Sequence, residues 1–379
     1  MGLTFIRQRS LFALAMGALM AISSAAAAQA EKDEKAPKAP KEPPTPEKIA
    51  EWKKEAEARA LFSADAPVEI KLVGNYKVIT KDRDTLSTKE YWGEVQMADG
   101  KGAELKIPVM LRTRGHYRLS SRNCSFVPLR LDFKKGEVKG TVFDGQDKLK
   151  LVTHCNPNPM YEEYMIREYL SYKVHNLISP RSYRARMAKV TYVDSATNTP
   201  IETRNGIFME HEDDVAKRME GEVVEIRRAL FDDVDPNQIL EVAIFEAFVG
   251  NTDWSLAALH NIRLVRQQNG TLLPVAYDLD FSGLVGTRYA TPDPRLGIRN
   301  VKERLYRGPC KEPEELAALF GPYRDKKDAI LKLYDETPGL DGKYRNDAKA
   351  FLNQWFKMLD TPRDAKWMFK ENCKVVPGV

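Results

Sequence analysis

The chain has 379 residues, of which 59 are lysine or arginine and 54 are aspartate or glutamate, giving a formal net charge of +5 at pH 7. Charges of both signs are interspersed without a long block of either, so we expect no nucleic-acid partner. The length suits one two-lobed domain, and no internal repeat divides it.

The first thirty residues have the pattern of a secretory signal peptide. Arg7 and Arg9 precede an apolar run from Leu11 to Ile22, and Ala28-Gln29-Ala30 is a small-x-small cleavage site. We therefore expect cleavage near Ala30 and a periplasmic or secreted protein. No later apolar run approaches the ~18 residues that a membrane helix needs, so no membrane span is expected.

Residues 31–48 are rich in Lys, Glu and Pro and lack large apolar side chains. This composition predicts a disordered or extended tether. A short amphipathic helix from Pro46 to Leu61 overlaps its end. A single folded domain is then expected over residues 49–379.

The first half of that domain is predicted to be rich in strands. Val68 to Val152 consists mostly of strand-like segments joined by glycine-containing turns. Within it, Lys148 to Val152 alternates polar and apolar residues, which places its two lysines on one face of a strand. Ala188 to Met209 predicts another hairpin, with Thr197-Asn198 in its turn.

The two lysines of this strand are candidate ligands for phosphate. Lys148 and Lys150 could each reach a phosphate group, or could simply face solvent. The helix predicted from Met160 to Ile178 follows and carries Glu168. We expect Lys150, paired with Glu168, to bind the phosphates of a cofactor, with Arg130 as the alternative cation.

Four cysteines in an exported protein predict two disulfides. Of the three possible connectivities, the pairing of Cys124 with Cys155 and Cys310 with Cys373 is favoured, because each pair then stays within one half of the chain. A zinc site is the alternative, but the close C-x-x-C spacing is absent.

A buried helix followed by a polar loop is predicted in the second half. Pro236 to Val249 is mostly apolar, with Asp235 as N-cap and proline at the first helical position. Gly250 ends the helix. The loop that it opens carries Asn251 and Asp253.

A hairpin follows the loop. Ile262 to Val265 and Leu272 to Ala276 are predicted as strands, and Asn269-Gly270 between them is typical of a two-residue turn. That turn fixes an antiparallel register in which Asn261 lies opposite Asp278, about 5 Å apart between Cα atoms.

The open end of the hairpin is a predicted metal site. Asp280 lies two residues beyond Asp278 and points to the same side if the strand continues. Together with Asn261 they provide the hard oxygen donors that Mg²⁺ or Mn²⁺ prefers beside substrate phosphates. Asp253 would orient an attacking hydroxyl for phosphoryl transfer. The alternative is that these aspartates are turn and cap residues, and His260 is expected to be packed or hydrogen-bonded.

The order of these parts resembles a known family, the spore-coat CotH-like atypical kinases. A helix, a loop bearing Asp and Asn, a hairpin and a second Asp at its end are also found in a protein-kinase C-terminal lobe. The resemblance covers roughly Pro108 to Leu284. Its blocks are Arg112-Thr113-Arg114-Gly115, Pro128 to Phe133, Phe143-Asp144-Gly145 with Lys148 to Leu151, the helix around Arg167-Glu168, and Asn251-Thr252-Asp253 through Asp280.

The resemblance implies a fold and a set of roles. The fold would be an α+β, protein-kinase-like arrangement with two lobes, a strand-rich N-lobe at about 66–180 and a helical C-lobe at about 181–379 that ends in helices near 313–320, 325–334 and 344–359. ATP and Mg²⁺ or Mn²⁺ would be the cofactors, and a protein outside the cytoplasm the phosphoryl acceptor. Asp253 would be the catalytic-loop acid, Asn261 a metal ligand, and Asp278, possibly with Asp280, the main metal ligand.

Two departures from the kinase pattern have consequences. The interval between Asp253 and Asn261 is longer than usual, so Ser255 to Leu259 must bulge out or form an extra turn. No G-x-G-x-x-G phosphate loop is present. A catalytically degenerate kinase-like binding or assembly protein is the alternative, and a metal-dependent phosphoesterase is a more distant one.

Overall fold

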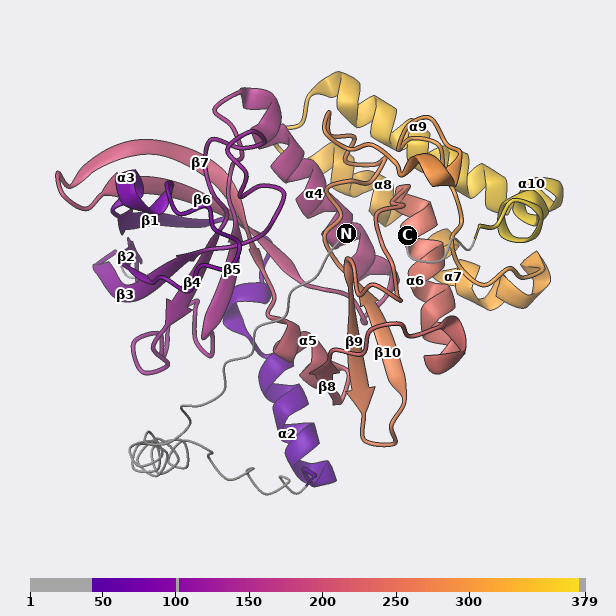
Figure 1. Cartoon of the computed structure of the whole chain (residues 1–379), viewed down its shortest axis with the longest axis horizontal. Helices are drawn as coiled ribbons and strands as arrows, with labels where there is room; N and C mark the ends of the chain where they lie inside the picture. The colour runs from indigo at the N-terminus through magenta and orange to yellow at the C-terminus, as the bar shows by residue number, and fades with distance from the viewer. Residues whose placement is uncertain (1–42, 100–101, 375–379) are drawn as a thin grey trace, which may run out of the picture. The chain divides into compact units, whose positions relative to one another are not determined.

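The computed structural model describes residues 43–99 and 102–374, and from Thr45 onward the chain forms one compact unit (Figure 1). The predicted signal peptide and the tether up to residue 42 lie outside the described residues. The first described helix is α2 (Pro46–Glu57), which begins where the overlapping helix was expected and is capped by the Thr45 side chain. A 3₁₀ turn follows at Ala60–Phe62.

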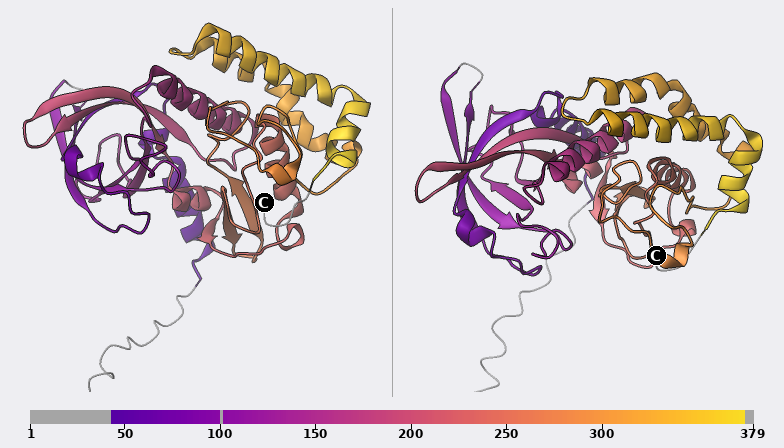
Figure 2. Two further views of the ribbon diagram at one scale, coloured as in Figure 1. Left: turned by 45° about the horizontal axis from the view of Figure 1, so that its top comes forward. Right: turned by 90° about the horizontal axis from the view of Figure 1, so that it is seen from above.

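The strand-rich half closes into a seven-stranded barrel, seen from two further directions in Figure 2. Neighbouring strands follow the order β1-β2-β3-β4-β5-β7-β6. All pairs are antiparallel except the closing one, in which β1 runs parallel to β6 from Val68 opposite Ala188 to Gly74 opposite Asp194. The strands are β1 (Val68–Gly74), β2 (Tyr91–Ala98), β3 (Glu104–Thr113), β4 (Leu129–Phe133), β5 (Lys148–Val152), β6 (Ala185–Asp194) and β7 (Thr199–Met209).

Alternating side chains fill the barrel. In β4 the residues Leu129, Leu131 and Phe133 are buried while those between them are partly exposed, as the period of a strand requires. Phe143, which precedes β5, stacks on Phe133 inside this core with ring centroids 5.1 Å apart. The short helix α3 (Tyr76–Ile79) contributes its buried residues to the same core.

The predicted α+β fold, a kinase-like arrangement with a strand-rich lobe and a helical lobe, is wrong. The strands form a closed barrel, and the other half contains a separate three-stranded sheet in the order β10-β9-β8 beside its helices. Hairpins can be predicted from the sequence because their turns contain characteristic residues. The parallel pairing of β1 with β6 joins segments far apart in the chain and has no such signal, so the closure was missed.

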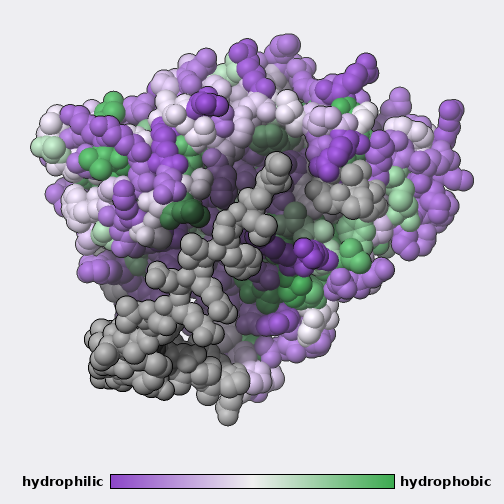
Figure 3. Space-filling model, in the orientation of Figure 1, coloured by the Kyte–Doolittle hydropathy of each residue, from purple (hydrophilic) through white to green (hydrophobic). Residues whose placement is uncertain are grey.

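The second half combines this small sheet with helices around a second apolar core. Helix α4 packs against β6 and β7 of the barrel and also against α7 and α8. Figure 3 shows that hydrophilic residues predominate on the face seen in Figure 1, because the large apolar side chains are collected in the two cores. The elements are α4 (Pro159–Ile178), α5 (Glu212–Arg218), β8 (Gly221–Val224), α6 (Pro236–Val249), β9 (Ile262–Gln267), β10 (Leu272–Ala276), α7 (Ala317–Asp325), α8 (Lys327–Glu336), α9 (Gly342–Leu359) and α10 (Pro362–Lys366), with 3₁₀ turns at Phe231–Asp233, Pro294–Leu296 and Pro313–Leu316 and a π turn at Trp367–Glu371.

Several local predictions are confirmed. Helix α6 has the predicted bounds and the Asp235 cap, and Gly250 ends it in the left-handed conformation with φ 71°. The helices expected near the C-terminus are present, and α10 was not predicted. In the described part of the chain no helix has both the length and the apolarity needed to cross a bilayer.

Both predicted disulfides are formed. Cys124 and Cys155 are bonded with Cα atoms 4.6 Å apart, and Cys310 and Cys373 with Cα atoms 5.7 Å apart. Disulfides persist in oxidising compartments. The pairing therefore indicates an environment outside the cytoplasm.

Candidate functional site

The β9–β10 hairpin is present, but its register differs from the predicted one by a single residue. Ala276 pairs with Ile262, and the Tyr277 N–H donates to the Asn261 carbonyl at 3.0 Å. Asn261 therefore lies opposite Tyr277 and not opposite Asp278.

The turn of the hairpin explains the shift. The Gln267 N–H donates to the Thr271 carbonyl and the Gly270 N–H to the Gln267 carbonyl, both at 2.9 Å, so residues 268–270 form a three-residue loop. Gly270 has φ 86°, as expected for the last residue of such a loop. A two-residue loop on Asn269-Gly270 would have given the predicted register.

Asp278 leaves the strand in an unusual backbone conformation. Its φ is 62°, and that of Asn261 is 54°. Residues other than glycine in this region cost about 1–3 kcal/mol and are found preferentially at functional sites. The Asp278 N–H donates to the Tyr172 hydroxyl at 2.9 Å, so α4 holds the residue in place. The two strained residues bracket the open end of the hairpin.

A cleft of about 1000 Å³ gathers nearly all the predicted site residues. It is walled by the loop after β3, by β5, by α4 and by the segments on either side of the hairpin. Arg130 is not among its lining residues and forms an ion pair with Asp132 on its own strand. The predicted residues that line the cleft are Lys150, Glu168, Asp253, Asn261, Asp278 and Asp280.

Both carboxylate oxygens of Asp253 have partners from the residues before the hairpin. The Asn261 amide Nδ2 lies 3.1 Å from Asp253 Oδ2 and also donates to the Asp253 carbonyl at 2.6 Å. His260 Nε2 lies 3.0 Å from Asp253 Oδ1, and this hydrogen bond raises the pKa of His260. The donor side of the Asn261 amide is thus used by Asp253, and Oδ1 is the atom of this side chain that could accept a ligand.

The extra residues between Asp253 and Asn261 form a closed loop. Ser255 and His260 exchange backbone hydrogen bonds of 2.9 and 3.0 Å. Leu259 supplies the bend with φ 51°. The predicted bulge from Ser255 to Leu259 is present, and it returns His260 to the side of Asp253.

An arginine that sequence reasoning missed binds two of the cleft carboxylates. Arg118 Nη2 lies 3.1 Å from Glu168 Oε2 and 3.2 Å from Asp280 Oδ2. The Tyr289 hydroxyl donates to Asp280 Oδ2 at 2.9 Å and lies 3.2 Å from the same Arg118 nitrogen. Arg118 sits in an irregular loop without periodicity. The signal that was available is the pair of arginines that flanks Gly115-His116-Tyr117.

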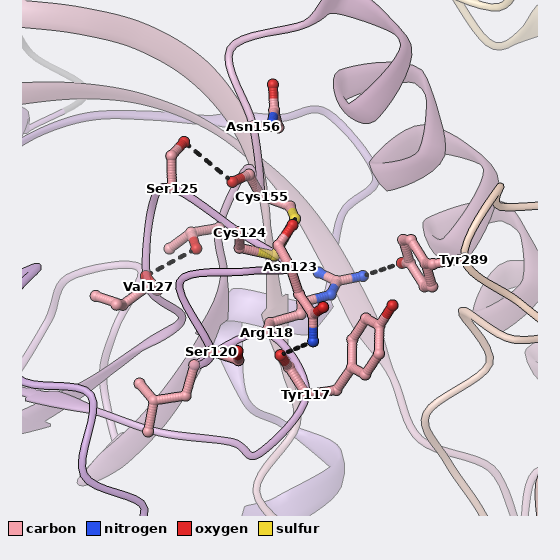
Figure 4. Close-up of a disulfide and its surroundings, with 12 residues drawn as sticks. Tyr117, Arg118, Ser120, Asn123, Cys124, Ser125, Val127, Cys155, Asn156 and Tyr289 are labelled. Carbon is pink, nitrogen blue, oxygen red and sulfur yellow. Dashed lines mark hydrogen bonds between the residues drawn. A yellow bond between two sulfur atoms is a disulfide. The ribbon is translucent and has the colours of Figure 1, made fainter.

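The loop between β3 and β4, residues 114–128, carries Arg114 and Arg118 and is called the arginine loop; it is anchored to the barrel beyond Arg118. Cys124 bonds to Cys155 after β5, and the Asn123 amide donates to the Tyr117 carbonyl at 2.8 Å (Figure 4). The Arg83 guanidinium donates to three carbonyls of the loop, those of Leu119, Cys124 and Ser125, at 2.9, 2.9 and 2.7 Å. The position of Arg118 is thus fixed by covalent and hydrogen-bonded contacts.

Lys150 does not form the predicted pair with Glu168. Its Nζ lies 2.6 Å from Glu212 Oε2 on α5. Burial would raise the pKa of Glu212, but Lys150 outweighs it and the pKa falls to about 2. Burial and the nearby Arg114 lower the pKa of Lys150 itself. Glu212 was missed because it begins the short helix after β7, 62 residues along the chain from Lys150, and no local pattern relates the two.

Burial dominates the electrostatics of the carboxylates in the cleft. It raises the pKa of Glu168 to about 8, although Arg118 acts in the opposite direction. Asp278 is open to solvent in the cleft, and desolvation by the walls of the cleft, followed by the neighbouring charge of Asp280, raises its pKa to about 6. The neighbouring carboxylates of Asp278 and Asp280 repel each other, and a bound cation would relieve that repulsion.

The donor set suits a hard divalent cation. An amide oxygen with two carboxylates, supplemented by water and substrate phosphates, is an arrangement that Mg²⁺ accepts. Over residues 43–99 and 102–374, no group of three or more His, Cys, Asp and Glu side chains is disposed to hold a metal. The set of Asn261, Asp278 and Asp280 has two such side chains and an amide, so a bound phosphate would have to complete it.

Comparisons with known proteins leave the family unassigned. The chain matches no protein-family model, and a search of curated proteins finds no significant relative. The resemblance to CotH-like kinases stays a prediction.

Proposed function

We propose that the protein transfers the terminal phosphoryl group of ATP to a protein outside the cytoplasm, with Mg²⁺ or Mn²⁺ as the metal. One observation carries the proposal: Asp253, Asn261 and Asp278 share a cleft with the cations Arg114, Arg118 and Lys150. The barrel architecture does not weaken it, because function resides in the site and one chemistry recurs on unrelated folds.

The metal would be held by the open end of the hairpin. Asn261 Oδ1 and the carboxylates of Asp278 and Asp280 are the proposed ligands. When bound, the ion would neutralise charge that develops on the transferring phosphates. Asp278, which lines the cleft beside Asp280, would gain from that neutralisation, because its raised pKa reflects the cost of carrying a charge there.

The cations that line the same cleft are proposed to bind the phosphates. Arg114 lies in the cleft close enough to Asp278 for its charge to be felt, and burial lowers its pKa. Lys150 comes from β5, where Glu212 holds its ammonium group. In other folds the backbone N–H groups of a glycine-rich loop hold the phosphates. Here the charged side chains would hold the triphosphate instead.

Asp253 is proposed to accept the proton of the attacking hydroxyl. The oxygen of that hydroxyl forms a bond to the terminal phosphorus, the bond to the leaving diphosphate breaks, and the proton passes to the Asp253 carboxylate. Asn261 and His260, each bonded to one oxygen of that carboxylate, keep it oriented toward the substrate. Orientation of this kind is the main contribution that a protein makes to phosphoryl transfer.

A binding or assembly protein without turnover is the second candidate. Arg118 favours it, because this side chain is itself a cation already paired with Asp280 and Glu168. Such an internal cation would let the cleft persist as a scaffold. Cleavage near Ala30 and a periplasmic or secreted location belong to both proposals.

The deciding experiment is a transfer assay with ATP labelled in the terminal phosphate. Purified protein is incubated with Mn²⁺, labelled ATP and an extract of envelope and secreted proteins. Labelled protein should accumulate with the wild type and not with Asp253→Asn. Asp328→Asn, an exposed aspartate on α8, is the matched control and should match the wild type.

The outcomes separate the two candidates. Transfer by the wild type that Asp253→Asn abolishes supports the kinase proposal. Absence of transfer, combined with metal-dependent ATP binding, supports the binding protein. Transfer at an undiminished rate by Asp253→Asn would contradict the role given to this carboxylate.

A further inference from the structure

A cluster of aromatic rings lies at one end of the cleft. Tyr117, in the arginine loop, is 41% exposed and lines the cleft together with Phe281. Its ring centroid lies 5.6 Å from that of Phe281 and 5.3 Å from that of Tyr289. Phe281 and Tyr289 are in turn 5.4 Å apart. Three rings from two chain segments thus form a shelf, and Tyr117 is its exposed member.

The shelf is joined directly to the charged part of the site. Tyr117 precedes Arg118, and Phe281 follows Asp280, so each ring is one residue away from a member of the buried ion pair. Figure 4 shows the Tyr117 and Tyr289 rings close together, with the Arg118 guanidinium pointing to the Tyr289 hydroxyl. An uncharged planar surface therefore adjoins cations and carboxylates along one cleft.

The shelf and the proposed proton acceptor occupy different ends of the cleft. Asp253 contacts His260 and Asn261, whereas the Tyr117 ring contacts Phe281 and Tyr289, beside Asp280. The hydroxyl acceptor is assigned to Asp253, which leaves the aromatic end for the phosphoryl donor. A nucleotide carries a planar base joined to a charged phosphate chain. The base would meet the aromatic surface at Tyr117, and the phosphates would meet the charged surface toward Asp278.

We infer that the shelf of Tyr117, Phe281 and Tyr289 binds the base of the nucleotide by stacking on Tyr117. The inference rests on the proposed function and deepens it by assigning a base subsite. Stacking on an aromatic side chain contributes about 1–3 kcal/mol per base and tolerates every base, since each has a π face. The site would bind nucleoside triphosphates in general, and both the base and the phosphates would contribute to the affinity.

The loop geometry supports a preformed shelf. Gly115 has φ +90° and open space around it, which lets the chain turn between Arg114 and Arg118. The Cys124–Cys155 disulfide and Arg83 fix the loop beyond Tyr117. A ring held this way loses little freedom when a base stacks on it, which strengthens binding.

The test compares two probes that share a phosphate chain and differ in the base. Calorimetric titrations with Mn²⁺ present measure binding of ATP and of inorganic triphosphate to the wild type, Tyr117→Phe and Tyr117→Leu. Leucine keeps the apolar contacts and removes the aromatic face. Trp92→Ala, which removes an exposed ring on β2 outside the cleft, is the control, and thermal unfolding checks that each variant is folded.

Tyr117→Leu should weaken ATP binding roughly tenfold and leave triphosphate binding unchanged, the size expected from one lost stack. Tyr117→Phe and Trp92→Ala should bind both probes as the wild type does. If both probes bind the wild type and Tyr117→Leu changes neither, or weakens both equally, the base subsite is overturned while the proposed function stands. If the wild type binds neither probe, the proposed function fails and the base subsite fails with it.

Discussion

Removal of Arg118 should destabilise the protein in a way that depends on pH. Arg118→Met keeps the length of the side chain and deletes the charge that contacts Glu168 and Asp280. Breaking a buried ion pair by removal of one partner costs about 3–5 kcal/mol. Near neutral pH, Glu168, whose pKa is about 8, is mostly protonated, so only Asp280 is left as a stranded charge. We therefore expect the free energy of unfolding at pH 6 to fall by about 3 kcal/mol, the lower limit of that range.

The loss should grow in alkaline solution. The pKa of Glu168 is higher in the folded than in the unfolded protein, so stability falls as pH rises from the unfolded value toward about 8 and then levels off in the wild type. Without Arg118 the pKa of Glu168 in the folded protein rises further, so the free energy of unfolding of the variant continues to fall above pH 8. The difference between variant and wild type should increase by about 1 kcal/mol between pH 8 and pH 9.

Urea unfolding at pH 6 and pH 9 measures both quantities. Arg122→Met, an exposed arginine in the same loop, is the matched control and should change stability little at either pH. An equal loss for Arg118→Met at the two pH values would refute the coupling between Arg118 and Glu168.

Three further perturbations test other parts of the account. Glu212→Gln should cost about 1–2 kcal/mol at pH 7, less than the ~3 kcal/mol that a fall in pKa to about 2 represents, because burial lowers the pKa of its partner Lys150. The stability from Glu212 is present above pH 4.5 and lost as pH falls through about 2, so in urea unfolding the difference between variant and wild type should shrink steadily between pH 4.5 and pH 2. A constant difference over that range would count against the pairing. Asp278→Gly should unfold at the wild-type temperature or above it, since glycine adopts φ 62° without strain. The same variant should lose Mn²⁺-dependent ATP binding in calorimetry, and retained binding would remove Asp278 from the ligand set. Replacing both Cys124 and Cys155 by alanine should cost roughly 2–4 kcal/mol of unfolding free energy and weaken triphosphate binding by loosening the arginine loop, and unchanged affinity would show that the loop does not depend on the disulfide.

Local features of the fold could be predicted from the sequence. Helix α6 has its predicted bounds because Asp235, Pro236 and Gly250 give unambiguous start and stop signals. The hairpin strands were found because Asn269-Gly270 separates two apolar segments. The disulfides followed from the cysteine count and the expectation of export.

Features that depend on distant contacts could not be predicted. The closure of the barrel by β1 and β6, and the Lys150–Glu212 pair, join segments that no local pattern relates. The register of the hairpin depends on whether its loop has two or three residues, and Gly270 is compatible with either. The two segments that meet at the open end of the hairpin were therefore predicted correctly. The residue opposite Asn261 was not, because it is Tyr277 and not Asp278.

The metal-dependent binding of ATP is the central claim, and thermal unfolding of the purified protein tests it most directly. Wild type and Asp278→Asn are heated alone, with Mn²⁺, with ATP and with both, and Asp328→Asn serves as the control. At about 100 times the dissociation constant a ligand adds roughly 2.7 kcal/mol to the stability. We predict a rise in unfolding temperature for the wild type and Asp328→Asn only when ATP and Mn²⁺ are present together, and none for Asp278→Asn. An equal rise in Asp278→Asn, or no rise in the wild type, would contradict the assignment of the cleft as a metal-nucleotide site.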